Sequence, residues 1–340
     1  MLEPGAILAG LVAGDDLTAD AMEGAVGQIM DGGWTDAQIG AFLTALRLKG
    51  ETPDELVAAV RALRGRAVTV AADGPLVDTC GTGGDGLGTF NVSTAAAFVV
   101  AAAGLRVAKH GNRAASGTVG GADVLEALGA RIELEPAEAE RALSEVGFCF
   151  LFAPLYHPAV RHVATARREL GFRTLFNLTG PLCNPAGATR QLIGLFSSDW
   201  LEPVAHALQS LGSEHALVVH GADGSDEISP AARTTVVELR DGRLSRYDIE
   251  PEQFGIRRCG IAELAGGDAA RNAAIIREVF DGRRGACADA VVLNAGAALY
   301  AGGRTETVDD GVRVAREVVE EGAALARLEA FVTFTRRGQA

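Results

Sequence analysis

A glycine-rich segment, Gly81-Thr82-Gly83-Gly84-Asp85, lies between an apolar stretch at residues 76–77 and an alanine-rich stretch at residues 94–103. Glycines let backbone N–H groups approach an anion closely, and the N-terminus of a following helix favours negative charge. Asn91 and Ser93 suit the N-cap of that helix and can also donate hydrogen bonds to a ligand. The segment predicts an anion-binding loop, although a glycine turn without a ligand has the same composition.

A basic cluster, Lys109-His110-Gly111-Asn112-Arg113, follows the predicted strand at residues 105–108. Ligands of open α/β sheets bind at the ends of strands. A single cation at such a place is usually solvated, but two cations with a histidine and an asparagine around a glycine are less easily explained as a surface loop. The glycine loop and this cluster together predict a pocket for a phosphorylated, multiply anionic small molecule.

Two adjacent carboxylates, Asp226 and Glu227, follow the predicted strand at residues 216–220 in a glycine-rich loop that also holds Asp223. Mg²⁺ prefers one or two carboxylates, with waters and substrate phosphates as its other ligands. The pair therefore predicts a magnesium site. A helix N-cap or a solvated turn is the structural alternative.

Residues 81–86 also fit the dinucleotide-binding pattern G-x-G-x-x-G. A dinucleotide site needs an acidic residue about 20 positions further on, to bind the ribose hydroxyls. The end of the next strand carries Lys109, His110 and Arg113 instead. We therefore favour phosphate recognition over NAD binding.

Three arginines, Arg167, Arg168 and Arg173, precede a loop with the sharply turned pairs Gly180-Pro181 and Asn184-Pro185. Most surface arginines are solvated, so each of them alone is weak evidence for a ligand. The loop that follows would form one wall of a small pocket.

The elements that position these residues divide into two kinds. The first 65 residues predict helices only, and both Thr35-Asp36-Ala37-Gln38 and Thr52-Pro53-Asp54-Glu55 have capping-box spacing. From about residue 75, strands are expected at 76–78, 105–108, 131–134, 148–152 and 216–220, and helices at 94–103, 122–128 and 137–146. This alternation predicts an α/β fold with a mostly parallel, helix-covered sheet. Asp241-Gly242 predicts a hairpin between residues 235–240 and 243–249, and residues 310–330 predict one closing helix.

Composition limits the partners and the compartment. The net charge of −13 argues against nucleic acid and against an anionic membrane as the main partner. The five cysteines are scattered and form no C-x-x-C pair, which disfavours a disulfide framework or a zinc site and favours a cytoplasmic location. No uncharged apolar stretch approaches the roughly 18 residues of a membrane span, so we expect neither a span nor a signal peptide.

Taken in order, the motifs resemble the anthranilate phosphoribosyltransferases of tryptophan biosynthesis along nearly the whole chain. The matching segments are Asp36-Ala37-Gln38-Ile39, Lys49-Gly50-Glu51-Thr52, Gly81-Thr82-Gly83-Gly84-Asp85, Thr89-Phe90-Asn91-Val92-Ser93-Thr94, Lys109-His110-Gly111-Asn112-Arg113, Ala122-Asp123-Val124-Leu125-Glu126-Ala127-Leu128-Gly129, Phe176-Asn177, Gly180-Pro181, Asn184-Pro185-Ala186 and Asp226-Glu227-Ile228-Ser229. Several motifs in this order are far more specific than any one of them.

The resemblance implies the fold of the pyrimidine nucleoside phosphorylases. A small helical domain over residues 1–70, joined by part of residues 160–195, would lie beside an α/β domain over residues 75–340. The family is usually a homodimer through the small domain. The implied reaction is the Mg²⁺-dependent transfer of 5-phosphoribose from its 1-diphosphate to the amino group of anthranilate, with no covalent enzyme nucleophile.

The resemblance also assigns residues to the substrates. The donor, phosphoribosyl diphosphate, would be bound by Gly81, Gly84, Asp85, Thr89, Asn91, Ser93, Thr94, Lys109, His110, Gly111, Asn112, Arg113, Ser116, Gly117 and Gly121. The acceptor, anthranilate, would be bound by Asn112, Arg167, Gly180 and Pro181, and Mg²⁺ by Ser93, Asp226 and Glu227.

One loop departs from the family pattern. Where the family usually has a Ser-Ser-Lys-Ser-Gly-Ser run, this chain has Ser116-Gly117-Thr118-Val119-Gly120-Gly121. The missing lysine and serine groups would each weaken donor binding by about 1–3 kcal/mol if they make charge-assisted contacts.

Three alternatives stay open from the sequence. The first is a paralogue that acts on another aromatic amine. The second is a nucleoside phosphorylase-like enzyme, which would need no acidic metal pair, so Asp226 and Glu227 weigh against it. The third is a chain without activity that binds nucleic acid or a partner protein, which the acidic balance disfavours.

Overall fold

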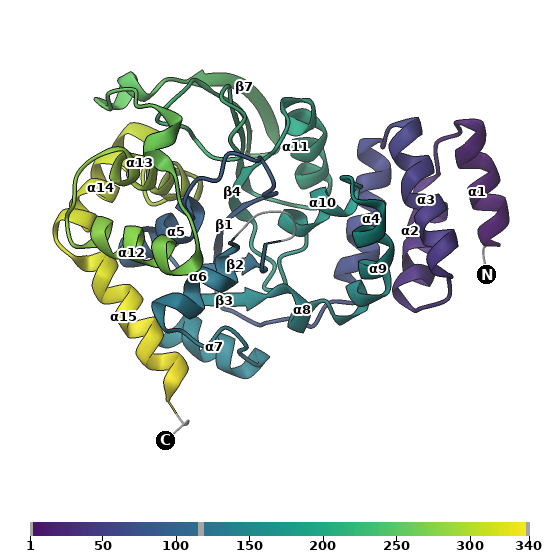
Figure 1. Cartoon of the computed structure of the whole chain (residues 1–340), viewed down its shortest axis with the longest axis horizontal. Coiled ribbons are helices and arrows are strands. Elements are labelled where there is room, and N and C mark those ends of the chain that lie inside the picture. Colours follow the sequence, from purple (N-terminus) through teal and green to yellow (C-terminus); the bar gives the residue numbers. More distant parts are fainter. Residues whose placement is uncertain (1–2, 115–118, 338–340) are drawn as a thin grey trace.

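The N-terminal part of the chain is a bundle of helices. The computed structural model describes residues 3–114 and 119–337. Figure 1 shows the bundle beside an α/β part, and its helices are α1 (Pro4–Ala13), α2 (Ala19–Met30), α3 (Asp36–Lys49), α4 (Pro53–Arg64), α9 (Arg161–Leu170) and α10 (Phe176–Thr179). Both predicted capping boxes are present. The hydroxyls of Thr35 and Thr52 each accept the N–H of the residue three positions further on, and the side chain of that residue accepts the threonine's own N–H.

The α/β part is built on one seven-stranded sheet in the order β3-β2-β1-β4-β5-β6-β7. Its strands are β1 (Val77–Gly81), β2 (Val107–Gly111), β3 (Phe148–Phe152), β4 (Arg190–Gly194), β5 (His215–Gly221), β6 (Thr234–Arg240) and β7 (Arg243–Ile249). The strands from β3 to β5 in that order are parallel, and β6 and β7 are antiparallel additions. The expected mostly parallel sheet is therefore confirmed.

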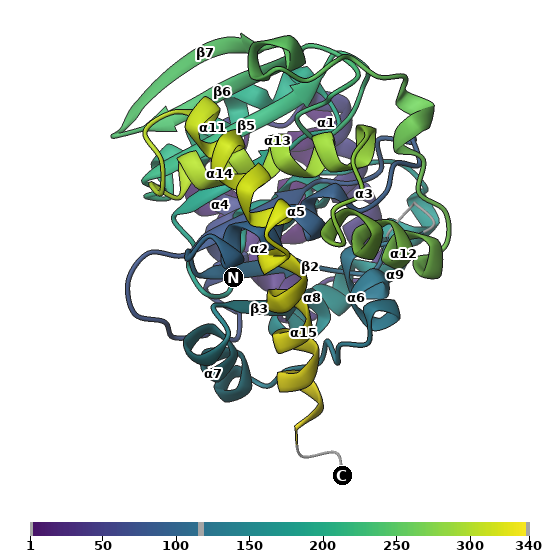
Figure 2. The ribbon, with the colours of Figure 1, turned by 90° about the vertical axis from the view of Figure 1, so that its left-hand side faces the viewer.

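Helices cover both faces of the sheet. The remaining helices are α5 (Val92–Ala102), α6 (Gly121–Leu128), α7 (Pro136–Glu145), α8 (Ala153–Tyr156), α11 (Leu201–Ser210), α12 (Ala269–Phe280), α13 (Ala286–Ala301), α14 (Val308–Glu320) and α15 (Ala323–Arg336), with 3-10 turns at Pro158–Val160, Gly180–Leu182, Ser198–Trp200, Pro251–Phe254 and Ile261–Leu264. Along β5, Leu217 and Val219 join the core that contains α5 and α13, whereas Val218 joins the core that contains α11 and the N-terminal helices. This alternation is the period of a strand buried on both faces. Figure 2 shows α15 lying across α5.

Two sequence expectations about elements were wrong. Residues 131–134 form no strand, because Arg131 N–H donates to Thr335 Oγ1 and the carbonyl of Leu134 accepts the hydroxyl of Tyr156. The closing segment is two helices rather than one, since Gly322 adopts a φ of 73° between α14 and α15. Strand β4 was missed.

The predicted hairpin is confirmed. In the ladder between β6 and β7, Arg240 pairs with Arg243 next to the turn and Thr234 pairs with Ile249 at the far end. The two turn residues, Asp241 and Gly242, have φ values of 50° and 71°. Two left-handed residues are what a two-residue type I′ turn requires.

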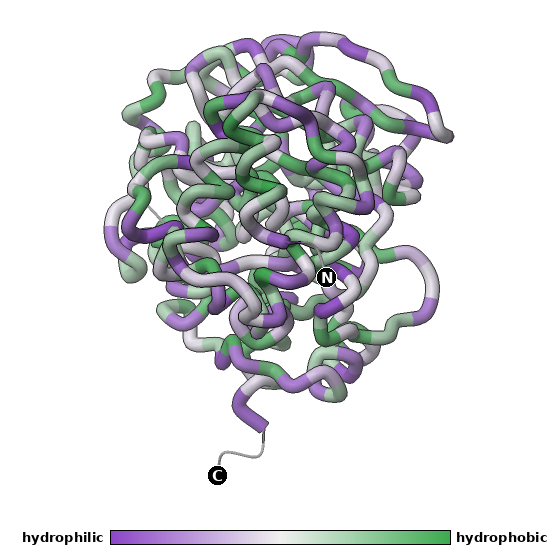
Figure 3. The backbone as a smooth tube through the Cα atoms, turned by 90° about the vertical axis from the view of Figure 1, so that its right-hand side faces the viewer, coloured by the Kyte–Doolittle hydropathy of each residue, from purple (hydrophilic) through white to green (hydrophobic). Residues whose placement is uncertain are grey.

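None of the described helices is long and apolar enough to cross a membrane. Figure 3 shows hydrophobic and hydrophilic stretches alternating along the whole tube, as expected for helices that bury one face.

Candidate active site

The glycine loop follows β1 directly and contacts the acidic pair. Thr82 N–H donates to the carbonyl of Gly194 at 2.9 Å, and Gly83 N–H donates to Asp226 Oδ2 at 2.6 Å. A Cβ at Gly194 would lie 1.5 Å from the carbonyl oxygen of Asp226. Only glycine at that position lets the acidic loop approach the sheet this closely. The anion that meets the N–H of Gly83 in this structure is therefore the protein's own carboxylate.

The N-terminus of α5 is capped by the second carboxylate. Asn91 occupies the N-cap position, as predicted, but its side chain makes no capping hydrogen bond. Ser93 N–H donates instead to Glu227 Oε1 at 3.1 Å, a charge-assisted bond at the positive end of the helix. The Asn91 amide oxygen accepts the hydroxyl of Thr94 at 2.5 Å. The expectation of an asparagine cap is corrected, because a carboxylate competes better for the same N–H groups.

Lys109 carries a buried charge into this cluster. Its side chain is buried, with the residue 4% exposed, and its ammonium donates to the carbonyl of Thr79 and, at 3.2 Å, to Ser93 Oγ. Burial lowers the pKa of Lys109, against the attraction of Asp78 and the carboxylates of the acidic loop. The basic and acidic motifs of the sequence are thus brought together at the strand ends.

Asp226 and Glu227 lie side by side, and both burial and the neighbouring carboxylates oppose their ionisation. Burial, followed by the charge of Asp85, raises the pKa of Asp226 to about 6, and burial with the neighbouring Asp226 raises the pKa of Glu227. A divalent cation would relieve this repulsion, and carboxylate oxygens are ligands that Mg²⁺ prefers. Within the described ranges no three His, Cys, Asp or Glu side chains form a complete metal cage. Two carboxylates leave the rest of the coordination of Mg²⁺ to substrate phosphates and water.

Buried polar side chains hold the acidic loop in place. Asn294 of α13 accepts Ile228 N–H at 2.9 Å and donates to the carbonyl of Ile228 at 2.8 Å. Asp223 accepts the hydroxyls of Ser225 at 2.8 Å and of Ser229 at 2.5 Å. These contacts rigidify the backbone on both sides of the carboxylates.

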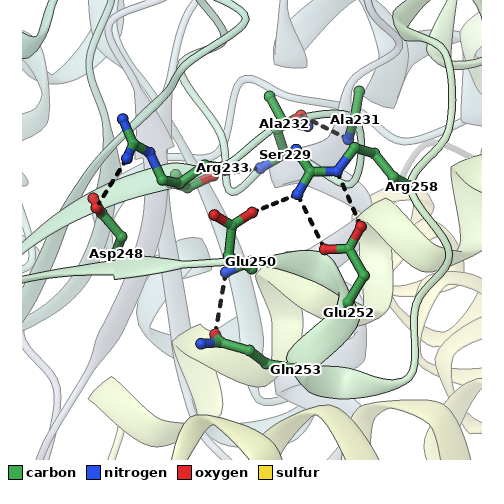
Figure 4. Close-up of polar contacts among 10 residues, drawn as sticks. Ser229, Ala231, Ala232, Arg233, Asp248, Glu250, Glu252, Gln253 and Arg258 are labelled. Carbon is green, nitrogen blue, oxygen red and sulfur yellow. Dashed lines mark hydrogen bonds and ion pairs between the residues drawn. The ribbon is translucent and has the colours of Figure 1, made fainter.

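The segment that follows the acidic loop is fixed by a second set of contacts. Ser229 Oγ accepts the N–H groups of Ala231 at 2.9 Å and Ala232 at 3.2 Å. Nearby, Arg258 pairs with both Glu250 and Glu252, as Figure 4 shows. These surface pairs are exposed and are expected to contribute little to stability.

The other predicted donor residues lie around this cluster. A Cβ at Gly121 would lie 3.1 Å from Thr94 Oγ1 and 3.8 Å from Lys109 Cε, which places Gly121 against the basic cluster. Arg113 is exposed, and its guanidinium pairs with Asp123 at 2.8 Å and Glu126 at 2.6 Å. Donor binding by Arg113 would have to compete with these carboxylates.

Three other residues predicted to bind the donor make contacts within the protein. Asp85 Oδ1 accepts Leu87 N–H at 3.1 Å, Thr89 forms a bridge with Ala265, and the carbonyl of Gly84 accepts the guanidinium of Arg173. Ser116 and Gly117 lie outside the described residues.

The predicted acceptor residues lie on the side of the helical bundle. Arg167 of α9 is half-buried with its guanidinium 5.8 Å from the centre of the Phe176 ring, and burial lowers its pKa. His110 Nδ1 lies 3.1 Å from the carbonyl oxygen of Gly180, so this histidine joins the basic cluster to the Gly180-Pro181 turn. Asn112 is exposed at the end of β2, and its Oδ1 accepts Arg113 N–H.

Sequence reasoning missed several residues that shape the site. Asp78, Asn184 and Asn294 are buried polar residues whose hydrogen bonds reach the motifs from elsewhere in the fold. Asn184 was named as part of a turn and of a family motif, but no role was assigned to it. A charged residue at the end of the strand predicted at residues 76–78 was the available signal for Asp78.

Two family profiles match the chain. Residues 6–67 match the helical bundle domain of a glycosyl transferase family, and residues 73–325 match its a/b domain. The anthranilate phosphoribosyltransferase of Rubrobacter xylanophilus is 53% identical over 96% of this chain and 95% of its own length. That of Methylococcus capsulatus is 52% identical over 97% of each chain. This chain belongs to the anthranilate phosphoribosyltransferase family.

Solved structures of anthranilate phosphoribosyltransferases have the same fold. The enzyme from Thermus thermophilus superposes with a TM-score of 0.92 at 45% identity, covering 97% of this chain and 99% of that one. The Saccharomyces cerevisiae enzyme in complex with PRPP and Mg gives a TM-score of 0.90 at 27% identity, covering 98% and 97%. The expected small helical domain followed by a larger α/β domain is confirmed.

Proposed function

We propose that this chain transfers 5-phosphoribose from phosphoribosyl diphosphate to the amino group of anthranilate, in tryptophan biosynthesis, with Mg²⁺ as its cofactor. The observation that carries the proposal is the meeting of Lys109, Ser93 and the Asp226-Glu227 pair at the ends of β1, β2 and β5. This arrangement offers a cation and a pair of metal-ligating carboxylates to a diphosphate. Arg167 and the Gly180-Pro181 turn lie on the acceptor side.

The reaction needs positioning and charge stabilisation rather than a covalent nucleophile. The amine nitrogen attacks C1 of the ribose, the bond from C1 to the diphosphate oxygen breaks, and the amine loses a proton. Lys109 offers positive charge to the departing diphosphate. A Mg²⁺ ion held by Asp226 and Glu227, with Ser93 as a further ligand, would neutralise charge on the same group. Arg167 holds the anthranilate carboxylate and directs the amine at C1.

An assay of the purified protein tests the proposal. Anthranilate fluorescence should fall when phosphoribosyl diphosphate and Mg²⁺ are both present, and should stay constant when either is left out. An unchanged signal in the complete mixture would refute the assignment. A panel of other aminobenzoates distinguishes anthranilate from another aromatic amine as the true acceptor.

We also propose that the enzyme is a homodimer through its helical bundle and works in the cytoplasm. Val12 of α1 and Leu48 of α3 are 80% and 83% exposed, and an interface through the bundle would bury these two apolar side chains. All five cysteines are free, in keeping with a reducing compartment. Light scattering of the wild type and of the V12E/L48E double variant tests the dimer, because only the variant should have the mass of one chain.

A further inference from the structure

The two strands that carry most of the site, β1 and β2, separate from each other after one pair of residues. Their ladder joins Val77 with Val107. By contrast, β1 stays paired with β4 along its whole length, from Val77 to Gly81, and β2 stays paired with β3 from Val107 to Gly111. The sheet therefore opens at a seam between β1 and β2. Backbone groups that face such a seam need other partners, because buried unpaired N–H and C=O groups are costly.

Side chains supply those partners. His110 N–H donates to Asp78 Oδ1 at 3.2 Å, in place of a carbonyl of β1. The carbonyl of Ala108 accepts Asn184 Nδ2 at 2.8 Å, in place of an N–H of β1. Asp78 is completely buried and Asn184 is 5% exposed, so water cannot easily replace either of them.

Asp78 lies at the centre of this arrangement. Its second oxygen, Oδ2, accepts Asn184 Nδ2 at 2.8 Å, while Asn184 Oδ1 accepts Ala186 N–H at 2.9 Å. One end of the loop at residues 180–186 is thus tied to Asp78 through Asn184. The other end is tied through His110, whose backbone binds Asp78 and whose ring contacts the carbonyl of Gly180 at 3.1 Å.

The donor side is anchored elsewhere. The glycine loop is held by the bond from Gly83 N–H to Asp226, and the N-terminus of α5 by the bond from Ser93 N–H to Glu227. Asn294 fixes the acidic loop from α13. The hydrogen bonds of Asp78 lead to the loop at residues 180–186, directly through Asn184 and indirectly through His110, and not to these donor anchors. Its link to the donor side is the attraction between its charge and Lys109.

We propose that Asp78 is a positioning residue for the acceptor, which holds the loop at residues 180–186 against the end of β2 through Asn184 and the backbone of His110. This inference rests on the proposed function, because it assigns Gly180 and Pro181 to the acceptor. Its distinguishing consequence is a selective effect: breaking the link between Asp78 and Asn184 disturbs acceptor binding more than donor binding.

The variant Asp78→Asn tests this consequence. The introduced amide must turn its NH₂ group toward either the N–H of His110 or the NH₂ of Asn184, so one buried contact becomes repulsive. We expect the KM for anthranilate to rise about tenfold or more, on the scale at which about 1.4 kcal/mol is one factor of ten. The dissociation constant of phosphoribosyl diphosphate with Mg²⁺, measured by calorimetry, should rise by a smaller factor, which reflects the lost attraction between Asp78 and Lys109.

Three further variants separate positioning from a merely structural role. Asn184→Ala breaks the same hydrogen bond from the loop side and should give the same selective effect on the KM for anthranilate. If Asp78→Asn does not fold, this variant tests the proposal in its place. The exchange D78N/N184D restores a donor–acceptor pair between the two positions but sets a carboxylate against the carbonyl of Ala108, so the KM should stay raised. Asn294→Ala, the matched buried asparagine on the donor side, should weaken donor binding instead.

Two results would overturn the inference in an enzyme whose wild type turns over anthranilate. One is an unchanged KM for anthranilate in both Asp78→Asn and Asn184→Ala. The other is an equal weakening of acceptor and donor in these variants. A wild type that binds the donor but does not consume anthranilate would refute the proposed function itself, and this inference with it.

Discussion

The carboxylate of Asp226 accepts the backbone N–H of Gly83 at 2.6 Å, although the two residues are 143 positions apart in the chain. This bond joins the predicted metal loop to the glycine loop through the protein's own groups. Glu227 makes the equivalent bond to Ser93 at the start of α5. The acidic pair thus serves the local architecture as well as its proposed role in metal binding.

Removing both negative charges should abolish most turnover. In the double variant D226N/E227Q the amide oxygens can still accept hydrogen bonds from Gly83 and Ser93, so the fold should persist, as circular dichroism would show. We expect a loss of activity that added Mg²⁺ does not restore. Wild-type activity at limiting Mg²⁺ would show that the pair is not the metal site.

Arg167→Ala should raise the KM for anthranilate far more than the KM for the sugar donor. The physical reason is the loss of a guanidinium from the acceptor's carboxylate, a contact to a charged group worth about 1.5–3 kcal/mol. Aniline, which has no carboxylate, should respond little to the change. The neighbouring Arg168, which is exposed, provides the control Arg168→Ala. Equal increases in both KM values would contradict the assignment.

Restoring the family's loop sequence should tighten donor binding. The variant G117S/T118K/V119S returns a lysine and two serines, and one good charged contact would improve the affinity by about 1–3 kcal/mol in a calorimetric titration. Gly121→Ser is best tested separately, because its Cβ would lie 3.1 Å from Thr94 Oγ1. If the affinity does not change and another aminobenzoate is the preferred acceptor, the loop was reshaped for a different substrate.

His110 should make the protein less stable in acid. Burial, together with the neighbouring His157, lowers the pKa of His110 from 6.5 to about 3. Because the folded pKa is below the unfolded one, the contribution of His110 to stability is fully present above pH 6.5 and is lost progressively as the pH falls toward 3. At pH 5 the loss should be about 1–2 kcal/mol.

The variant His110→Asn provides the comparison, since its amide can still donate to the carbonyl of Gly180 but does not titrate. Free energies of unfolding, measured in urea between pH 4.5 and pH 7.5, should fall less steeply with decreasing pH in the variant than in the wild type. Parallel curves would show that His110 does not titrate between the folded and unfolded states.

The sequence alone determined the features that depend on neighbouring residues. The capping boxes at Thr35 and Thr52 and the hairpin at Asp241-Gly242 are local, because each is closed by contacts within a few positions. The glycine loop and the acidic pair were recognisable from their residue types. A close backbone approach requires glycine, and a site for a divalent cation requires carboxylates. Their ordered succession then identified the family.

Tertiary structure decided which of these groups meet. No local pattern shows that Glu227, rather than Asn91, caps α5, because the carboxylate arrives from a loop more than 100 positions away. Residues 131–134 have the apolar alternation of a strand but lie where their backbone groups bond to Thr335 and Tyr156. The seam between β1 and β2, and with it the role of Asp78, exists only once the sheet has formed, since it is defined by backbone partners that are absent from the ladder.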